Sequence, residues 1–567
     1  MTSRSSKVRT LEEAVAEVVR PGMLLHFALA QARPNAAIRE LLRQFRGSTA
    51  RFGASATGFG GPQLGLFLVA CGLVDRIVTG FVGNQYPRVG PNARANRLID
   101  AGSVDIDAWP LLTFLQRLKA GSMGLEWTVT GSLVGSDIAH GHNDVRRVEG
   151  ATLVRALTPD VAFLHAVVAD QDGNAILSVP VGEGIVGAAA ARLGAIVTVE
   201  RVVEREELRA AAGVPILPGA IVRAVCPEPF GAHPSGVFAP AQFMDYAYAD
   251  DYDFIAESTD AHELDDDRLA DWIETRLLPG PDAATTERLR SRNAFAAPVV
   301  IDADAPATPE ETMAAIGSRL LVGLAAGSNP PAFVLTGIGV SSLAAWLARD
   351  TSTSFPPLIS EVGLYDYEPA RGNPFLFNYP NLASVAGLAD TETILGVLVQ
   401  GHGSDSVGVL AAGQLDRRGD INSTRTSRGW ITGSGGANDI ASGSRRNVVL
   451  VPHRPGRLVY EVDFVTSPGC NVSAIVTDRA VMERRGEEFA ITGVVVTNGQ
   501  MVDAVVRDVV AATPWPVAVG EDVTCLEGPT ATELRILREY DPAAFMLGAR
   551  SSERDPDEVA NQTEAKA

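Results

Sequence analysis

A glycine-rich stretch over residues 433–442, with the sequence GSGGANDIAS, is the segment of this chain best suited to chemistry. Its small residues leave backbone N–H groups open to a ligand, because glycine has no side chain and tolerates unusual dihedral angles. Asn438 or Asp439 can then cap the helix that follows, whose N-terminus favours negative charge. Such a loop can stabilise an oxyanion or hold a phosphate, although a tight strand-to-helix turn has the same composition.

A second candidate is Glu361, in the sequence LISEVG over residues 358–363. An apolar run leads directly to this carboxylate, and Gly363 follows two residues later. The carboxyl edge of a parallel sheet is where α/β proteins build their sites. Glu361 can act there as an ion-pair partner, a general base or a nucleophile, and these residues alone leave the three roles open.

Other familiar motifs are missing or incomplete. The sequence holds no P-loop, HExxH or GxSxG motif, and Gly58-Phe-Gly60-Gly61 lacks the GxGxxG spacing of a dinucleotide site. His140 and His142 form an H-x-H pair near Asp137 and Asp144, but no third ligand is evident. We therefore favour a polar loop over a metal site there, and expect no bound metal.

The elements that must position these residues alternate between apolar β-branched runs and amphipathic segments. This alternation indicates an α/β fold with two similar tandem domains and largely parallel sheets. We expect strands over residues 75–81, 161–169, 195–200, 298–301, 332–336, 394–399, 447–451 and 490–497. We expect helices over residues 11–19, 36–45, 112–120, 309–326 and 342–348.

The chain divides into two large halves at residues 1–250 and 301–550. Residues 251–300 are rich in Asp, Glu, Ala and Arg and contain a Pro-Gly-Pro break, which indicates an acidic helical connector. Residues 551–567 are polar without periodicity, so we expect a disordered tail.

A short internal repeat supports two related halves. Residues 161–174 and 407–420 both read as an apolar strand that ends in D-x-x-G followed by Asn or Asp. In such a turn the Asp side chain bonds the backbone and the glycine supplies a positive φ. We favour duplication, while two independent strand–turn units remain the alternative.

Composition limits the possible partners. The chain has 567 residues, and 48 Lys and Arg against 68 Asp and Glu give a net charge of −20, which disfavours nucleic acid and anionic membranes. The four cysteines are far apart, which argues against a zinc site or disulfides and suits a reducing compartment. The N-terminus lacks an apolar leader and the longest apolar run, residues 64–74, is too short to span a bilayer, so we expect a cytoplasmic protein.

Several motifs together identify a family that this sequence resembles. It is similar to the family I CoA-transferases, most closely to the branch that includes glutaconate CoA-transferase. The first half carries α-subunit patterns over residues 21–44, 115–138 and 151–175, and the second carries β-subunit patterns over residues 358–363, 410–424, 433–442 and 531–542. The chain therefore resembles a fused α–β protomer.

The resemblance implies a ping-pong thioester exchange. Glu361 matches the family's glutamate, which attacks an acyl-CoA to give a mixed anhydride and then a glutamyl-CoA thioester. Coenzyme A is then a substrate, the second substrate is a small carboxylic acid, and no cofactor is permanently bound. The resemblance assigns the oxyanion loop to Gly435, Gly436 and Ala437, and CoA contacts to Asn438, Gln414 and Asn381.

Some positions depart from the family pattern. Residues 27–29 read Phe-Ala-Leu where relatives often have G-G-F, and residues 111–113 read Leu-Leu-Thr where many have Gln-Gly-Thr, so a side-chain oxyanion donor is missing there. Glu126 replaces a common Pro and is either a surface substitution, which we favour, or a second functional carboxylate. These changes lie in the half that shapes the acyl pocket, so the acyl group is left open.

Alternatives follow from the same residues. A CoA-dependent hydrolase on this scaffold, or a non-catalytic ligand-binding protein, would share the motifs without the transfer. Tyr365, Tyr367 and Phe377 are aromatic candidates for the acyl-pocket wall or for the core. We expect a homodimer or a homotetramer, because symmetric assemblies are common among soluble enzymes.

Overall fold

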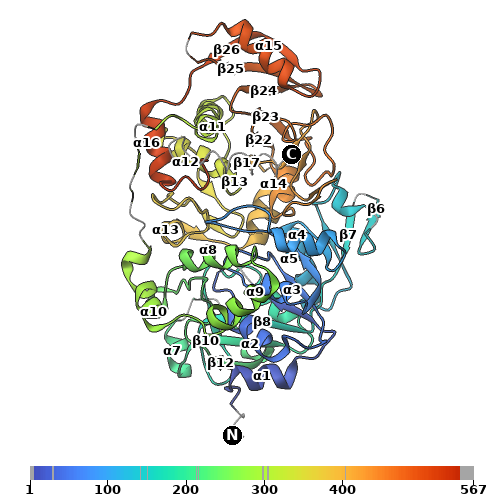
Figure 1. Cartoon of the computed structure of the whole chain (residues 1–567), viewed down its shortest axis with the longest axis vertical. Coiled ribbons are helices and arrows are strands. Elements are labelled where there is room, and N and C mark those ends of the chain that lie inside the picture. Colours follow the sequence, from blue (N-terminus) through green and yellow to red (C-terminus); the bar gives the residue numbers. More distant parts are fainter. Residues whose placement is uncertain are drawn as a thin grey trace.

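The computed structural model of the chain describes residues 6–548, except 29–30, 141, 150, 212–213, 215, 296–298, 300, 303–304, 402–403 and 498. Two α/β halves follow each other along the chain, the first blue to green and the second yellow to red (Figure 1). No helix among the described residues is long and apolar enough to cross a membrane. The predicted tail, residues 551–567, lies outside the described residues.

The first half is built on a largely parallel sheet with the strand order β11-β9-β8-β1-β2-β3-β4, in which β8 also pairs with β10 and β10 with β12. Its strands are β1 (Leu24–Phe27), β2 (Phe52–Ala56), β3 (Val74–Thr79), β4 (Asp105–Ala108), β8 (Val161–Ala169), β9 (Ala175–Leu177), β10 (Ala195–Val202), β11 (Ile216–Leu217) and β12 (Val222–Pro227). Its helices are α1 (Leu11–Val18), α2 (Asn35–Phe45), α3 (Gly65–Ala70), α4 (Ala93–Asp100), α5 (Leu111–Ser122), α6 (Gly184–Ala190) and α7 (Arg205–Ala210). A small antiparallel sheet of β5 (Trp127–Thr130), β6 (Val145–Val148) and β7 (Ala151–Arg155) projects beside α5 (Figure 1).

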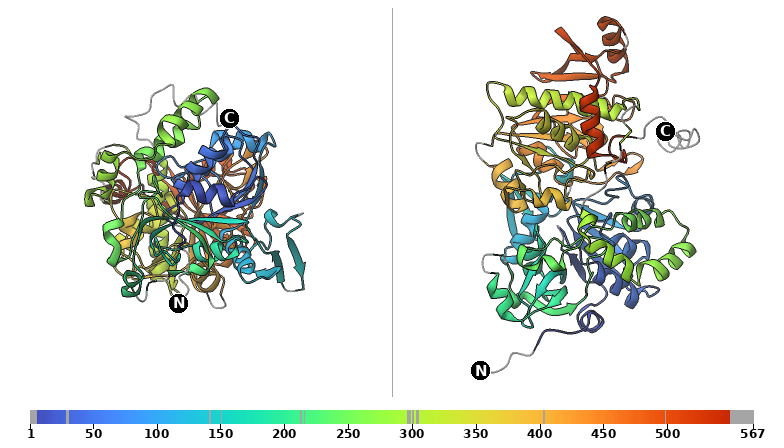
Figure 2. Two further views of the ribbon diagram at one scale, coloured as in Figure 1. Left: turned by 90° about the horizontal axis from the view of Figure 1, so that it is seen from below. Right: turned by 90° about the vertical axis from the view of Figure 1, so that its left-hand side faces the viewer.

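The second half has a mixed sheet with the strand order β16-β15-β14-β13-β17-β22-β23-β24-β25-β26. Its strands are β13 (Phe333–Thr336), β14 (Leu358–Ile359), β15 (Leu364–Tyr365), β16 (Gly387–Leu388), β17 (Ser406–Ala411), β22 (Arg446–Leu450), β23 (Val472–Val476), β24 (Ala480–Arg485), β25 (Glu488–Val495) and β26 (Ala518–Leu526). Its helices are α11 (Pro309–Ala326), α12 (Val340–Thr351), α13 (Tyr379–Ala383), α14 (Ala437–Gly443), α15 (Val502–Ala512) and α16 (Ala531–Tyr540). Strands β25 and β26 and helix α15 form the end farthest from the first half (Figures 1 and 2).

The two halves share one topology. The parallel order β2-β1-β8-β10-β12 in the first sheet matches the parallel order β14-β13-β17-β22-β23 in the second. The predicted repeat segments begin on the equivalent strands β8 and β17. The match supports the predicted duplication.

The repeat turns themselves are built alike, as predicted. Asp170 Oδ1 accepts from the amides of Asp172 at 3.0 Å and Asn174 at 2.9 Å, and Asp416 Oδ1 accepts from the amides of Arg418 at 2.9 Å and Asp420 at 3.1 Å. The glycines between them, Gly173 and Gly419, have φ values of +92° and +83°. Asp and Gly therefore act in both turns as the sequence predicted.

The stretch 251–300 contains the helices α8 (Tyr252–Ala261), α9 (Asp266–Trp272) and α10 (Ala283–Arg290). Helices α8 and α9 share the hydrophobic core of the first half. Phe67 of α3 stacks on His262 and Trp272 with ring centroids 4.3 and 5.2 Å apart. These two helices therefore cover the first half, while the domain boundaries remain a prediction.

Most predicted elements occur, but one prediction was wrong. Residues 394–399 form part of a helical segment, Glu392–Val399, and not a strand. Asp390 Oδ1 accepts from the amide of Thr393 at 2.7 Å, which supports the helical start. A short continuous apolar run cannot separate a strand from a buried helix by periodicity, which explains the error. The predicted strand 298–301 lies partly outside the described residues.

Candidate active site

Glu361 lies just beyond the carboxyl end of β14, which pairs in parallel with β13. A tight turn holds it there: Ser360 N donates to Leu364 O at 2.9 Å and Gly363 N donates to Ser360 O at 3.0 Å. Gly363 has a φ of +112°, and a Cβ atom on it would overlap the carbonyl oxygen of Ala389. The glycine two residues after Glu361 is therefore required by the turn.

The glycine loop and Glu361 meet directly. A Cβ atom on Gly436 would overlap Oε2 of Glu361, so the carboxylate occupies the space that the missing side chain leaves. Two residues that are far apart in the sequence thus lie side by side.

Only part of the predicted oxyanion loop offers a free donor. Gly435 N donates to Gly80 O at 2.9 Å, and Ala437 N donates to Ser434 O at 3.0 Å. The Gly436 N–H has no acceptor among the residues that the structure describes. Gly436 is therefore the one residue of the three whose amide is available to an oxyanion.

Residues of the first half pack against the glycine loop and form hydrogen bonds with it. Leu111 N, at the start of α5, donates to Gly435 O at 2.9 Å, and Val82 N donates to Thr432 O at 2.7 Å. Together with the bond from Gly435 to Gly80, these contacts bring the loop after β3 and the first turn of α5 against the glycine loop. The site therefore lies at the boundary between the halves.

Asp439 is a site residue that the sequence reasoning missed. The Asn-Asp pair was expected to cap α14, but α14 begins at the Gly436 N-cap with no side-chain cap. Asp439 is fully buried and accepts instead from Leu112 N of α5 at 3.0 Å and from the Ser132 hydroxyl. The carboxylate therefore caps a helix of the other half, which no local sequence pattern reveals.

The two carboxylates make the site electrostatically unusual. Burial, and next the charge of Asp439, raise the pKa of Glu361 to about 7. Burial also raises the pKa of Asp439 to about 7, against hydrogen bonds from Ser132, Leu112 and Leu111 that lower it. No described group donates a hydrogen bond to Glu361. A poorly solvated carboxylate of this kind suits a nucleophile or a general base.

Two of the residues predicted to contact CoA are engaged within the protein. The buried Asn438 amide donates to Thr466 O at 2.9 Å and accepts from Leu133 N at 3.3 Å. Gln414 Oε1 accepts from Asn422 Nδ2 at 2.8 Å. Asn438 thus supports the loop across the boundary, and direct contact of either residue with CoA remains a prediction.

Asn381, the third predicted CoA contact, is also fully buried. Its side chain accepts from Ala370 N at 2.8 Å and donates to Leu376 O at 3.0 Å. These bonds hold the chain segment between β15 and α13, and a role for Asn381 toward CoA remains a prediction.

The two histidines of the H-x-H pair contact different carboxylates. His140 pairs with Asp137 at 2.8 Å and His142 pairs with Asp107 at 2.8 Å. Within the described ranges, no group of three or more His, Cys, Asp or Glu side chains could hold a metal ion.

The aromatic candidates differ in their surroundings. Tyr367 is fully buried and its hydroxyl accepts from Trp346 Nε1 at 2.9 Å, which makes it a core residue. Tyr365 is 40% exposed. The backbone oxygen of Phe377 accepts from Gln31 Nε2 of the first half at 2.9 Å.

One departure from the family pattern, Glu126, lies at the surface. The Glu126 side chain is 69% exposed and pairs with Arg155 at 3.1 Å, as expected of a surface substitution. Leu111 and Leu112, at the second departure, are buried, and Thr113, which matches the pattern, contacts the hydroxyl of Thr130 at 3.1 Å.

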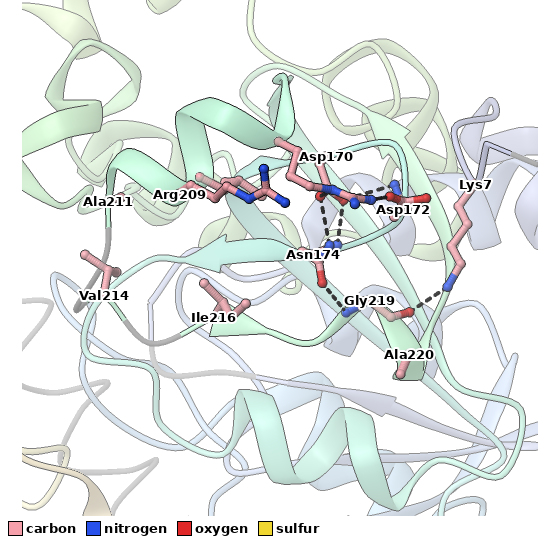
Figure 3. A pocket seen from close by; sticks show the side chains of 12 residues that line it. Lys7, Asp170, Asp172, Asn174, Arg209, Ala211, Val214, Ile216, Gly219 and Ala220 are labelled. Carbon is pink, nitrogen blue, oxygen red and sulfur yellow. Dashed lines mark hydrogen bonds and ion pairs between the residues drawn. The ribbon is translucent and has the colours of Figure 1, made fainter. Parts of the chain in front are cut away.

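A separate cavity of about 740 Å³ lies beside the repeat turn of the first half (Figure 3). Asp170, Asn174 and Lys7 line it, and Lys7 Nζ donates to Gly219 O at 2.6 Å. Asn174 bonds Asp170 and the amide of Gly219, and none of the predicted site residues lines the cavity.

Comparison with known proteins gives matches to both kinds of CoA-transferase chain. Residues 8–226 match the family model described as coenzyme A transferase. The chain is 31% identical over 235 residues to one chain of 3-oxoadipate CoA-transferase from Pseudomonas knackmussii, covering 37% of this chain and 86% of that protein. It is 28% identical over 258 residues to one chain of glutaconate CoA-transferase from Acidaminococcus fermentans, covering 41% of this chain and 77% of that protein.

A solved structure matches almost the whole chain. An acyl-CoA transferase from Escherichia coli O157:H7, determined as a thioester complex with CoA, aligns with a TM-score of 0.64 and 15% identity. The alignment covers 94% of this chain and 96% of that chain. The likeness shows that the two halves together form the fold of a single-chain acyl-CoA transferase.

Proposed function

Because this chain belongs to the coenzyme A transferase family, as a fusion of the two kinds of chain found in its relatives, we propose that it moves CoA from an acyl-CoA to a carboxylic acid through a covalent adduct on Glu361. The observation that carries this proposal is the contact between the Glu361 carboxylate and the Gly436 loop. The carboxylate that we propose as the nucleophile thus lies beside an amide N–H that is without an acceptor in the described structure.

In the first step, a carboxylate oxygen of Glu361 attacks the thioester carbonyl of the acyl-CoA. The tetrahedral oxyanion accepts from Gly436 N–H, the C–S bond breaks, and CoA leaves as a thiolate from a glutamyl–acyl anhydride. Because no described group donates to Glu361, the carboxylate loses no hydrogen bond when it reacts.

In the second step, the CoA thiolate attacks the glutamyl carbonyl and the original acid leaves as a carboxylate. The enzyme now holds a glutamyl-CoA thioester. A second acid carboxylate attacks this thioester, and the same two steps run in reverse. Overall, the acyl-CoA and the second acid are converted to the original acid and a new acyl-CoA, with no proton gained or lost.

Steady-state kinetics with acyl-CoA and acid varied together test this proposal. The covalent route predicts parallel double-reciprocal lines and no net release of free CoA, either with or without an acceptor acid. Intersecting lines, which indicate a ternary complex, would contradict it. Stoichiometric CoA release with no acid would favour the hydrolase alternative.

Replacement of the nucleophile separates an enzyme from a ligand-binding protein. Glu361→Ala should reduce kcat/KM by about 1,000-fold or more, since the covalent route is lost. The matched control is Glu368→Gln, because the Glu368 side chain is 62% exposed and pairs with Arg349. Absence of any transferase or hydrolase activity in the unmodified protein would instead favour the non-catalytic alternative.

A further inference from the structure

Helix α5 of the first half is capped by groups of the second half. Its N-cap is Pro110, which provides no side-chain cap. The first backbone N–H groups of a helix need acceptors from outside the helix. Leu111 N finds Gly435 O at 2.9 Å, and Leu112 N finds the Asp439 carboxylate at 3.0 Å. The start of α5 is therefore fixed to the catalytic loop by two bonds across the boundary.

Further bonds fix the orientation of the Asp439 carboxylate. The Ser132 hydroxyl donates to Oδ1 of Asp439, while Leu112 N donates to Oδ2. Gln400 Nε2 donates to Ser132 Oγ at 2.7 Å, which leaves the hydroxyl hydrogen directed to Asp439. Both oxygens of this buried carboxylate thus have donors, in contrast to those of Glu361.

Asp439 lies three residues after Gly436, the residue that the Glu361 carboxylate contacts, and its negative charge acts on Glu361. Other charged groups on the neighbouring elements are paired elsewhere: Arg117 of α5 with Asp144 at 2.8 Å, and Lys119 of α5 with Glu392 of the segment 392–399 at 2.6 Å. Among the described residues, Asp439 is the one charged group that acts on Glu361. When Glu361 becomes an anhydride or a thioester, its negative charge is lost and the repulsion between the two carboxylates ends.

We infer that Asp439 is a positioning residue of this site: it fixes the glycine loop to α5, and its charge beside Glu361 favours the acylated, neutral state of the nucleophile. The inference rests on the proposed function, because it assigns a role within the same covalent route. Asp439 acts through Glu361 and through the loop, and touches no reacting atom itself.

The test is the pH dependence of kcat/KM for wild type, Asp439→Asn and Asp137→Asn. In wild type, activity should rise with pH as Glu361 ionises. Asp439→Asn keeps the size and one acceptor of the side chain but removes its charge. The acidic limb of the kcat/KM profile should therefore shift to lower pH by about one unit, and the maximum rate should fall. Asp137→Asn is the matched control, since Asp137 accepts from Val465 N across the same boundary at 2.7 Å. Its limb should stay at the wild-type pH.

A merely structural role would lower the rate at every pH without moving the limb, and that result would overturn the inference. Ser132→Ala provides a second variant if Asp439→Asn does not fold. It removes a donor that favours ionised Asp439, so the limb should move in the same direction by a smaller amount. An unmoved limb in this variant would likewise count against the charge effect.

The two proposals fail in different ways. If wild type forms no covalent adduct with acyl-CoA, the proposed function fails. If the adduct forms on Glu361 but the limb of Asp439→Asn stays at the wild-type pH, only the role of Asp439 fails.

Discussion

The carboxylate of Glu361 fills the space where a side chain on Gly436 would stand. Glu361 follows strand β14 and Gly436 begins helix α14, so two elements of the second half bring a nucleophile and an amide donor together. A methyl group on Gly436 would force the end of the Glu361 side chain to move, which gives a direct test of whether the reaction needs the carboxylate in this position.

Gly436→Ala should inactivate the enzyme while the fold survives. The added methyl group must displace the Glu361 carboxylate, and a shift of this kind away from the reacting geometry costs about 100-fold in kcat. Rate measurements with far-ultraviolet circular dichroism check this.

The matched control is Gly323→Ala, near the C-terminal end of α11, where a Cβ atom meets nothing within 4 Å. It should retain wild-type activity and gain up to about 1 kcal/mol of stability, because alanine favours a helix over glycine. Wild-type kcat in Gly436→Ala would mean that the carboxylate does not need its observed position.

Glu361→Gln should change stability only at high pH. The folded protein holds the pKa of Glu361 at about 7, above the value of about 4.3 in an unfolded chain. The folded state therefore binds this proton more tightly, and stability falls as the pH rises between those values. The variant avoids that cost, so it should gain up to about 4 kcal/mol at pH 8 and almost nothing at pH 4.

Urea unfolding at the two pH values measures this difference. The exposed Glu368 serves again as the control, and Glu368→Gln should show no pH-dependent gain. An equal change in stability for Glu361→Gln at pH 4 and pH 8 would show that Glu361 titrates normally.

Asp170→Ala and Asp416→Ala should each destabilise the protein by about 1 to 3 kcal/mol, since each removes a carboxylate that accepts two backbone amides in a buried turn. Denaturant unfolding measures the loss. Asp253→Ala is the control, because its side chain is 93% exposed. A loss in only one of the two turns would argue that the repeat is not structurally equivalent.

Glu126→Gln should keep kcat/KM within about twofold of wild type, because the exposed ion pair with Arg155 contributes little to stability or to the site. Initial rates over several acyl-CoA donors check this. A loss of about tenfold or more would identify Glu126 as a second functional carboxylate.

The sequence predicted the parts of the site that depend on residue type. Glu361 at a strand end, the glycine loop and the repeat turns at Asp170 and Asp416 are all local patterns, and the structure has them where they were expected. The α/β fold of two similar halves also follows from alternating apolar runs, which report burial directly.

Long-range pairing could not be read from the sequence. Asp439 was expected to cap its own helix, but it caps α5 instead. Its partner, the amide of Leu112, lies 327 residues away in the chain, so no local pattern predicts the bond. The amide of Gly435 is occupied by Gly80 O of the first half and that of Ala437 by Ser434 O of the loop, and neither bond can be read from the sequence. The helical segment at 392–399 depends on tertiary packing. Homo-oligomerisation and the CoA contacts of Asn438, Gln414 and Asn381 remain predictions.

The most direct measurement is a peptide mass map of the protein after incubation with acyl-CoA alone, quenched in acid. The account predicts that the peptide containing Glu361 gains the mass of CoA less one water, that an added acid removes this adduct, and that Glu361→Gln never forms it. Turnover without any adduct at Glu361, or an adduct on another residue, would contradict the account.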